Sequence, residues 1–312
     1  MKVVLGKTGL EVCPICIGAW QLAGPLWFNG KPDGHPDPGK QNVLHLIREL
    51  GDMGVNFIDT AEQYGNGESE RRVGEAIQGK RDQWIISTKF GYRVGADGRR
   101  IDDSSPNTIR KSMEGSLKRL ATDYIDVYLY HCEPRMEDLE EAKSVLDALV
   151  AEGKCRYYGI STNNIRIIQA MLDLDMLDVL QYNTNLLREA KDVYELATAH
   201  NVGTQVRGVM AQGRLSGKYF KHQPTWHADD NRSNHAGKVD YRRYAVLEQH
   251  IPEGYTMAQV AIRYMLDLPG NHSICLGAKT IDDYKVALDA LSLPALENQV
   301  RTKLAASASN LT

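Results

Sequence analysis

The sequence lacks several features that would point to a membrane, a secreted fold or a polyanionic partner. No apolar run reaches the roughly 18 residues that a membrane helix needs, and the opening residues, MKVVLGKTGLEV, lack the long apolar core of a secretory signal. A net charge of -3 gives no strong positive field for nucleic acid or an anionic lipid surface. We therefore expect a soluble cytoplasmic protein that binds neither nucleic acid nor membranes.

Cysteine is also scarce. The five cysteines are odd in number and scattered over 312 residues, which argues against a disulfide framework and predicts free thiols. Cys13 and Cys16 have the spacing of a redox motif, but they lie at the start of the apolar run CPICIGAW. We interpret both as buried strand cysteines.

No group of residues has the spacing of a metal site. The polar segment Lys221–Asp240 contains His222, His227 and His235, close to two aspartates, Asp229 and Asp230, but these spacings match no known metal-binding template. We interpret the segment as a solvated loop and expect no metal.

Short β-rich apolar runs alternate with helical patterns, in which apolar residues recur at three- and four-residue spacing. Eight strands each followed by a helix, in about 300 residues, are typical of a (β/α)8 TIM barrel. We therefore predict a single barrel domain spanning residues 1–312. The predicted strands are Ile15–Ala19, Val55–Asp59, Trp84–Lys89, Tyr124–Tyr130, Cys155–Ile160, Asp178–Tyr182, Gly203–Gly208 and Ser273–Leu276.

Three segments lie outside this regular pattern. The initial VVLGKTGLEV predicts a β-hairpin around Thr8-Gly9 that closes the bottom of the barrel. Leu22–Gln41 is rich in Gly and Pro, and Lys221–Asp240 is rich in polar residues. Both would follow barrel strands, so we expect them to form lids over a site.

The stretch NFIDTAEQYGNGESERRVGEAI places Gly65 and Gly67 between a predicted strand and a helix, as in a dinucleotide-binding loop. A full fingerprint needs a third glycine three positions after the second, where this sequence has Glu70. The glycines alone are therefore weak evidence for a Rossmann site.

Ionisable residues stand at the end of three consecutive predicted strands or directly after it. These are Asp59, Lys89 and His131, and Tyr64 follows Asp59 by five residues. The carboxyl ends of barrel strands meet at one face, so we expect these four side chains to lie together. A lysine ammonium beside Tyr64 should lower the pKa of the phenol, and Asp59 should keep the lysine charged.

This set suits the protonation of a carbonyl oxygen while a hydride arrives at its carbon. Tyr64 would act as the general acid, and His131 would polarise the carbonyl. No side chain supplies a hydride, so a nicotinamide or flavin cofactor is implied.

The segments IGAW, NFIDTAEQYGNGESE, ISTKFG, YIDVYLYH, YYGISTNN, VLQYN, RGVMAQGRLSGKY and LGAKT resemble, in this order and spacing, the aldo-keto reductase superfamily along the whole chain. The resemblance is strongest to its bacterial, short-loop branch. It implies a (β/α)8 barrel that binds NADP(H), less often NAD(H), extended across the barrel mouth without a Rossmann domain. On this basis Gly65 and Gly67 shape a loop that presents Tyr64.

The resemblance also assigns roles to residues. It places the catalytic tetrad on Asp59, Tyr64, Lys89 and His131, and it puts Trp20 beside Tyr64 and His131 at the substrate. The residues implied to contact the cofactor are Gly18, Ala19 and Trp20 in the first loop, Ser161, Asn163 and Gln181 at the nicotinamide carboxamide, Arg207 at the ring or pyrophosphate, Gly213, Leu215, Gly217 and Lys218 at the pyrophosphate, and Gly277, Lys279 and Asp283 at the adenosine end.

The adenosine end departs from the family pattern. Asp283 stands where Gln or Arg is common, and Ala287 stands where an Asn usually contacts adenine. Lys279 would pair with a 2′-phosphate, whereas an acid nearby is unfavourable unless it points away or pairs with that lysine. We expect NADP(H) to be preferred, with NAD(H) use left open.

Two hypotheses of different class follow. The first is an NADP(H)-dependent reductase of small aldehydes or ketones, because the tetrad is complete. The second is a regulatory protein that holds nicotinamide as a redox sensor with little turnover. Tyr92, Arg93, Arg99 and Arg100 in the third loop would favour a sugar, phosphorylated or carboxylated aldehyde if they face the pocket, and are otherwise solvated. The oligomeric state is left open.

Overall fold

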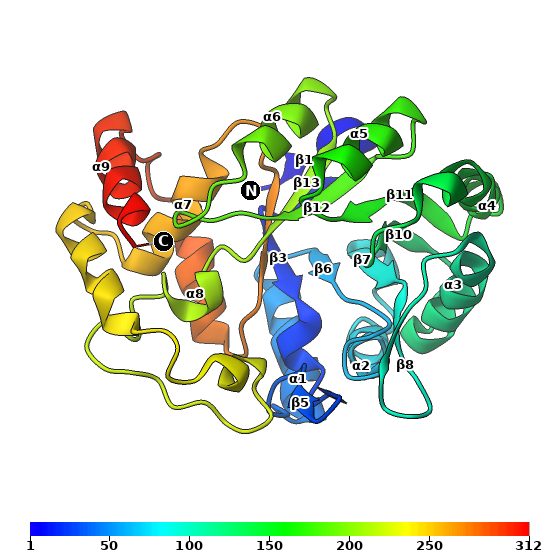
Figure 1. Cartoon of the computed structure of the whole chain (residues 1–312), viewed down its shortest axis with the longest axis horizontal. Coiled ribbons are helices and arrows are strands. Elements are labelled where there is room, and N and C mark those ends of the chain that lie inside the picture. Colours follow the sequence, from blue (N-terminus) through cyan, green and yellow to red (C-terminus); the bar gives the residue numbers. More distant parts are fainter. Residues whose placement is uncertain (312) are drawn as a thin grey trace.

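Eight parallel strands close into a barrel in the computed structural model, which describes residues 1–311 (Figure 1). The barrel strands are β3 (Ile15–Gly18), β6 (Phe57–Asp59), β7 (Ile85–Phe90), β10 (Ile125–Tyr130), β11 (Cys155–Ser161), β12 (Val179–Asn183), β13 (Gly203–Arg207) and β14 (Ser273–Leu276). The ring closes where β14 pairs with β3, with Cys275 opposite Cys16. The predicted strands and the (β/α)8 architecture are confirmed, with strand ends shifted by two residues at most.

Helices surround this barrel and cover its outer face. They are α1 (Lys40–Asp52), α2 (Glu68–Ala76), α3 (Pro106–Leu120), α4 (Leu139–Ala151), α5 (Ile165–Asp173), α6 (Lys191–Ala199), α7 (Met257–Leu266) and α8 (Ile281–Ala290), followed by α9 (Asn298–Ser309). Local sequence sets several helix starts. At α7, for example, Thr256 and Gln259 form a reciprocal capping box that satisfies backbone amides of the first turn. The buried residues of each helix recur at helical spacing, as Ile167, Ile168 and Met171 do in α5.

The N-terminal segment forms the expected hairpin. β1 (Val3–Val4) pairs with β2 (Glu11–Val12) in antiparallel fashion. Between them, the backbone amide of Lys7 donates to the carbonyl of Asn201, just before β13 begins. The hairpin therefore lies at the N-terminal ends of the barrel strands. Its apolar residues pack with barrel-interior residues and close the bottom.

The two halves of the CPIC segment face different parts of the core. Cys13 packs in the large cluster between strands and helices, whereas Cys16 belongs to the smaller cluster inside the barrel. Their exposed fractions are 3% and 0%. Both are buried free thiols, as expected, but only Cys16 lies in a strand, whereas Cys13 lies in the short link between β2 and β3.

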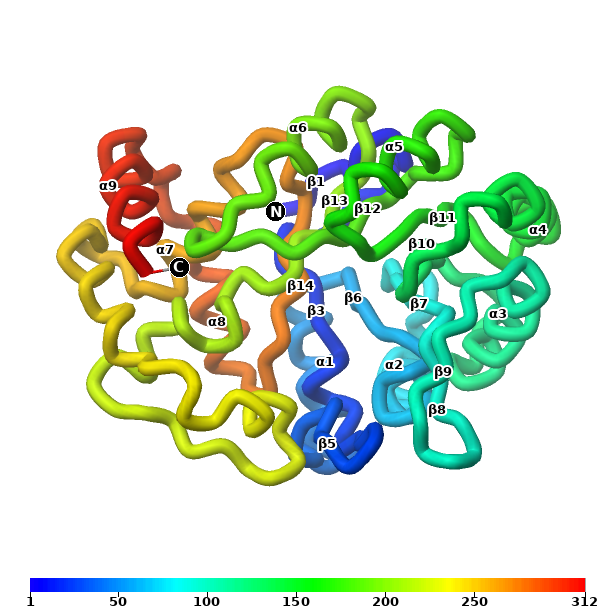
Figure 2. The backbone as a smooth tube through the Cα atoms, viewed as in Figure 1, coloured from blue at the N-terminus to red at the C-terminus, as the bar shows by residue number. Residues whose placement is uncertain are grey.

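The two irregular segments, Leu22–Gln41 and Lys221–Asp240, meet each other. The first contains a small hairpin of β4 (Trp27–Phe28) and β5 (Lys31–Pro32). Figures 1 and 2 show the long segment after β13 reaching across to β5. Three hydrogen bonds join the segments: Trp27 Nε1 to Asp229 Oδ1 (3.0 Å), the Asn231 amide to the Gly34 carbonyl (2.9 Å), and Asn234 Nδ2 to the Pro32 carbonyl (2.8 Å).

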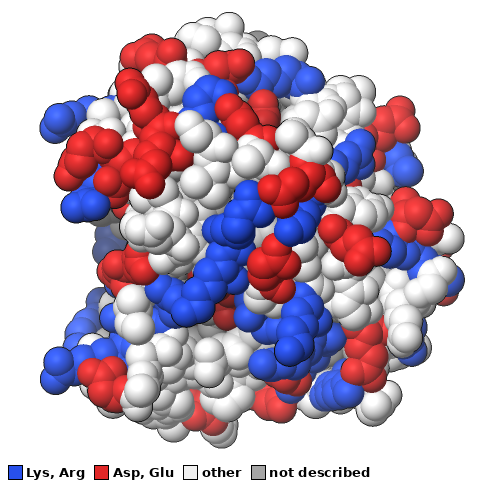
Figure 3. All heavy atoms as spheres, turned by 90° about the vertical axis from the view of Figure 1, so that its right-hand side faces the viewer, with Lys and Arg blue, Asp and Glu red and all other residues white. Residues whose placement is uncertain are grey.

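The surface carries charges of both signs in close alternation. Figure 3 shows Lys and Arg beside Asp and Glu over the side of the molecule that α3 and α4 occupy. Ion pairs on this side include Arg110 with Glu152 and Lys154 with Glu114. Across residues 1–311, no helix is both long and apolar enough to cross a membrane.

Candidate active site

Tyr64 is held by a tight turn between β6 and α2. Gly65, Asn66 and Gly67 all have positive φ, at 58°, 53° and 84°, and α2 begins immediately after them. A Cβ on Gly65 would lie 2.5 Å from the carbonyl oxygen of Ala23, so a larger residue would disturb the backbone of the first loop. In this structure the glycines form the turn that presents Tyr64, as expected.

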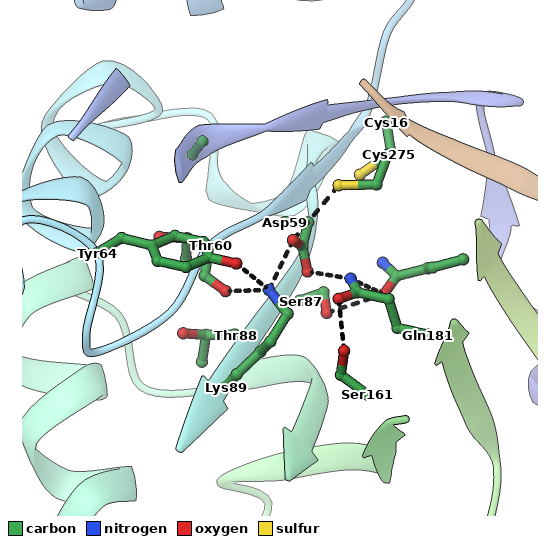
Figure 4. A network of polar contacts seen from close by, with 12 residues as sticks. Cys16, Asp59, Thr60, Tyr64, Ser87, Thr88, Lys89, Ser161, Gln181 and Cys275 are labelled. Atoms are coloured by element: carbon green, nitrogen blue, oxygen red, sulfur yellow. Dashed lines mark hydrogen bonds and ion pairs between the residues drawn. The ribbon is translucent and has the colours of Figure 1, made fainter. Parts of the chain in front are cut away.

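Lys89 is at the centre of the polar network below this turn. Its ammonium donates to Asp59 Oδ2 at 2.7 Å, to the Thr60 carbonyl at 2.9 Å and to the Tyr64 hydroxyl at 3.1 Å (Figure 4). The lysine is completely buried at the end of β7, and Asp59 is 3% exposed at the end of β6. Asp59 and Thr60 at the end of β6 and Tyr64 in the turn that follows therefore meet at one nitrogen atom from the neighbouring strand β7.

Electrostatics keep this lysine charged despite its burial. Burial alone would lower the pKa of Lys89, but the charge of Asp59, together with Tyr64 and Cys275, outweighs it and raises the pKa overall. This agrees with the expected role of Asp59. An ammonium at this position is a permanent hydrogen-bond donor to the phenol oxygen.

The expectation that the pKa of Tyr64 would be lowered is wrong, because the net shift is upward. Burial raises the pKa of Tyr64, and although Lys89 lowers it, the pKa remains at about 12. The negative charge of Asp59 adds to the upward shift. Tyr64 is therefore a protonated phenol at neutral pH, which is the form that a proton donor needs.

His131 follows β10 and lies beside Tyr64. The two rings meet edge to face with centroids 5.6 Å apart, and the Tyr92 ring lies 4.9 Å from His131 on another side. Burial lowers the pKa of His131 well below its ordinary value, and the charges of Lys89, Arg207 and Arg100 lower it further. The imidazole is therefore neutral and has a single N–H to donate.

A second polar chain extends from Asp59 toward the far side of the barrel. Gln181 Nε2 on β12 donates to Asp59 Oδ1 at 2.9 Å, and Ser161 Oγ on β11 donates to Gln181 Oε1 at 2.9 Å. Asn163 instead bonds the backbone of Asn183, through both its amide nitrogen and its carbonyl oxygen. The tetrad and the predicted carboxamide residues thus occupy one continuous region.

These residues open into a cavity of about 1450 Å³. Fourteen of the predicted site residues line it: Gly18, Trp20, Asp59, Tyr64, His131, Ser161, Asn163, Gln181, Arg207, Gly213, Lys218, Gly277, Lys279 and Asp283. Lys89 lies behind the wall, beneath Tyr64. The side chains of Ala19 and Leu215 are buried in the hydrophobic core, and Gly217 does not line the cavity.

At the predicted phosphate end of the cavity, charged side chains form pairs that the sequence did not indicate. Asp283 pairs with Lys218, which links the loop after β13 to α8. Lys279 donates to the carbonyl of Pro36 at 3.1 Å, and burial lowers its pKa. Ala287, the other unusual position, is buried in the core.

The cavity wall also contains residues that sequence reasoning either missed or left undecided. Tyr92 and Arg100 line the cavity from the hairpin of β8 (Tyr92–Val94) and β9 (Arg100–Asp102), and the guanidinium lies over the Tyr92 ring. Asp33 and Gln63, which were missed, also line the cavity and bond each other at 2.6 Å. No short motif marks the contact, because Asp33 reaches Gln63 only through the way the long segment after β3 folds back.

The remaining loop residues take other positions. Arg93 pairs with Asp103, and Arg99 is an exposed partner of Asp97. Trp20 faces the cavity and its ring centroid lies 6.1 Å from that of Tyr64. Among residues 1–311, no three His, Cys, Asp or Glu side chains are placed to hold a metal ion.

Comparisons with known proteins agree with this geometry. The model of the aldo/keto reductase family matches residues 14–307. The chain is 31% identical over 288 residues to aldo-keto reductase YhdN of Bacillus subtilis (strain 168), covering 88% of this chain and 84% of that protein. It is 31% identical over 231 residues to the NADH-specific methylglyoxal reductase of Escherichia coli (strain K12), covering 69% of each.

Two further comparisons bear on function and fold. The chain is 30% identical over 312 residues to a probable voltage-gated potassium channel subunit beta of Arabidopsis thaliana, covering 93% of this chain and 91% of that protein. Among solved structures, the holo form of aldo-keto reductase AKR11C1 from Bacillus halodurans superposes with a TM-score of 0.82 at 26% identity, covering 99% of this chain and 96% of that one.

Proposed function

The chain belongs to the aldo/keto reductase family and is an NAD(P)H-dependent oxidoreductase, and we propose that it reduces small aldehydes or ketones with NADP(H), using Tyr64 as the general acid. The observation that carries this proposal is the triple contact of the Lys89 ammonium with Asp59, Thr60 and Tyr64 at the edge of the cavity. A purely structural lysine would have no need for a phenol partner that opens onto a large pocket.

The residues along the cavity fit a nicotinamide dinucleotide. Ser161 and Gln181 offer donors and acceptors beside the tetrad, as a carboxamide needs. Arg207, Lys218 and Lys279 also line the cavity, and their positive charges suit phosphate groups. When bound, a reduced nicotinamide supplies the hydride that no side chain can supply.

The tetrad residues would protonate the carbonyl oxygen, orient the carbonyl group and stabilise the phenolate that is left. Tyr64 donates its phenolic proton to the carbonyl oxygen as that oxygen gains negative charge. The neutral imidazole of His131 orients the carbonyl through its N–H, and Lys89 stabilises the phenolate that remains. Asp59 holds the ammonium in place from below.

The charge balance at the phosphate end supports NADP(H), with NAD(H) use left open. Lys279 lines the cavity and donates to a backbone carbonyl, and the two nearby carboxylates, Asp283 and Asp230, are already paired with Lys218 and Arg232. An acid that already has a basic partner repels a 2′-phosphate less than a free one. The relative that is named NADH-specific shows that both cofactors have to be tested.

Replacing Asp283 with asparagine should strengthen NADPH binding selectively. The change removes one negative charge and frees Lys218, so we expect the dissociation constant for NADPH to fall about fivefold, as roughly 1 kcal/mol from a partly exposed charge would give. The constant for NADH should stay nearly unchanged. Both are measured by fluorescence titration, with Asp282→Asn, the exposed neighbour, as control. Equal shifts for the two cofactors would contradict the proposed location of the 2′-phosphate.

The pH dependence should differ between the two directions of the reaction. Because the pKa of Tyr64 is about 12, the phenol stays protonated, and the rate of carbonyl reduction should be independent of pH between about 6 and 9. Alcohol oxidation requires the phenolate, whose fraction rises tenfold per pH unit below the pKa. Its rate should therefore rise up to the highest pH at which the protein stays folded. An oxidation plateau near neutral pH, measured at saturating substrates, would be inconsistent with this assignment.

The test of the proposed function is the loss of reduced-nicotinamide absorbance with a reactive aromatic aldehyde, comparing NADPH with NADH. Turnover with NADPH supports the reductase. The match to a potassium channel subunit beta favours a second candidate, a nicotinamide-binding regulatory protein with little turnover. Tight NADPH binding with negligible turnover would favour that candidate, and absence of nicotinamide binding would refute both.

Three further properties belong to the same proposal. We infer one barrel domain over residues 1–312, since the family match spans nearly the whole chain. The five free cysteines suit a reducing compartment, which supports a cytoplasmic location. The substrate is a small carbonyl compound, because the cavity must hold it together with a dinucleotide.

A further inference from the structure

Two cysteines, Cys16 and Cys275, lie directly opposite each other on neighbouring strands of the barrel. Cys16 on β3 and Cys275 on β14 are register partners where the barrel closes. Paired strands lie about 4.8 Å apart, and disulfides span Cα separations of roughly 4.4–6.8 Å. The backbone spacing therefore permits a bond between these two residues.

The two thiols also interact with each other and with the catalytic carboxylate. Figure 4 shows their sulfur atoms adjacent, next to Asp59. The contact between the thiols lowers the pKa of Cys275 and raises that of Cys16, and the Cys16 thiol also donates to the carbonyl of Ile17 at 3.8 Å. Cys275 in turn donates to Asp59 Oδ2 at 3.4 Å. The thiols thus form a short chain that ends on the partner of Lys89.

Only one of the two thiols faces the cavity. Cys275 lines it, whereas Cys16 has an exposed fraction of 0%. Gly18 leaves room at this point, because a Cβ there would lie 3.2 Å from the Cys275 sulfur. A small oxidant in the cavity would therefore meet Cys275 first, with Cys16 directly behind it.

We propose that Cys16 and Cys275 form a reversible disulfide in the wall of the catalytic cavity when a hydroperoxide enters it, and that this bond lowers turnover. In the first step the Cys275 thiolate attacks the peroxide oxygen, the O–O bond breaks, and a sulfenic acid and one hydroxide are formed. In the second, the Cys16 sulfur displaces the sulfenic oxygen as water. Two thiols and one hydrogen peroxide thus give one disulfide and two water molecules.

The expected effect on activity follows from the contact with Asp59, and this part rests on the proposed function. Oxidation removes the S–H that donates to Asp59 Oδ2, the oxygen that also accepts from Lys89. A disulfide also ties β3 to β14 beside Gly18, at the edge of the cavity. We expect carbonyl reduction to fall at least threefold and to recover with a dithiol reductant.

The speed of the reaction should depend on pH. The contact with Cys16 and the charge of Lys89 lower the pKa of Cys275, but burial and the charge of Asp59 outweigh them, so the pKa is raised overall. Attack requires the thiolate. Disulfide formation should therefore be slow near neutral pH and accelerate as pH rises.

The test treats the full-length protein with millimolar hydrogen peroxide, alkylates the remaining thiols and maps tryptic peptides. Residues 8–40 contain both Cys13 and Cys16, and residues 264–279 contain Cys275. We expect the two peptides to appear joined, two hydrogen masses below their sum. The joined species should persist in Cys13→Ser and disappear in Cys16→Ser. Its absence from the wild type, or its persistence in Cys16→Ser, would overturn the proposal.

Further measurements of crosslinking and of turnover distinguish this inference from the proposed function. Saturating NADPH should slow formation of the joined peptides, because Cys275 lines the cavity that the cofactor would fill. Full turnover in protein that is completely crosslinked would overturn the inhibitory role. A reduced protein that never turns over would refute the reductase instead, while the crosslink itself would still form.

Discussion

Replacing Tyr64 with phenylalanine should reduce carbonyl turnover by about 10²–10⁴-fold, the range expected when a positioned general acid is lost. The hydroxyl accepts a hydrogen bond from Lys89 at 3.1 Å, and in this pocket the phenol is protonated because its pKa is raised to about 12. Phenylalanine keeps the ring and its edge-to-face contact with His131. The turnover number with NADPH and an aromatic aldehyde is the quantity to measure.

Cofactor binding should survive this change, and the two measurements together make the test specific. We expect the NADPH dissociation constant of Tyr64→Phe to stay within about threefold of the wild type, since one hydroxyl is removed from a large cavity. Tyr92→Phe is the matched control, because Tyr92 also lines the cavity and also lies beside His131. If Tyr64→Phe kept at least a third of the wild-type turnover, the general acid would have to be another group.

The strand positions could be predicted because each barrel strand is a short apolar run bounded by turn residues. In a parallel barrel the carboxyl ends of all strands lie at one face, so a residue predicted at a strand end is also predicted to lie at that face. This is why the sequence alone predicts that Asp59 and Lys89, thirty residues apart along the chain, should meet. Tyr64 depends in addition on three consecutive residues with positive φ, which the Gly-Asn-Gly sequence favours.

Features that depend on burial or on loop folding could not be predicted in the same way. The sequence indicates that Lys89 is a candidate neighbour of Tyr64. Only the packing determines that the effect of burial on the pKa of Tyr64 is larger than the opposite effect of Lys89, so that this pKa is raised. The pairing of Asp283 with Lys218, and the bond between Asp33 and Gln63, join segments whose relative positions follow no periodic pattern. Cys16 and Cys275 meet only because the last strand closes against the first.

Replacing Lys89 with methionine should abolish turnover and also destabilise the protein strongly. Lys89 and Asp59 are both buried, so the change leaves the Asp59 carboxylate without its cation, which typically costs about 3–5 kcal/mol in the free energy of unfolding. Urea unfolding monitored by circular dichroism measures this loss. Arg110→Met, which breaks an exposed pair with Glu152, is the control and should change stability little.

The double variant Asp59→Asn/Lys89→Met separates the structural role of the pair from its catalytic role. With both charges removed, no buried ion lacks a partner, and the amide oxygen at position 59 can still accept from Gln181. We therefore expect its loss of stability to be smaller than the sum of the two single losses by at least about 2 kcal/mol. Turnover should remain absent in the double variant, because nothing then stabilises the phenolate of Tyr64. Recovery of turnover along with stability would mean that the pair only supports the fold, whereas stability without turnover would assign the Lys89 ammonium to the chemistry.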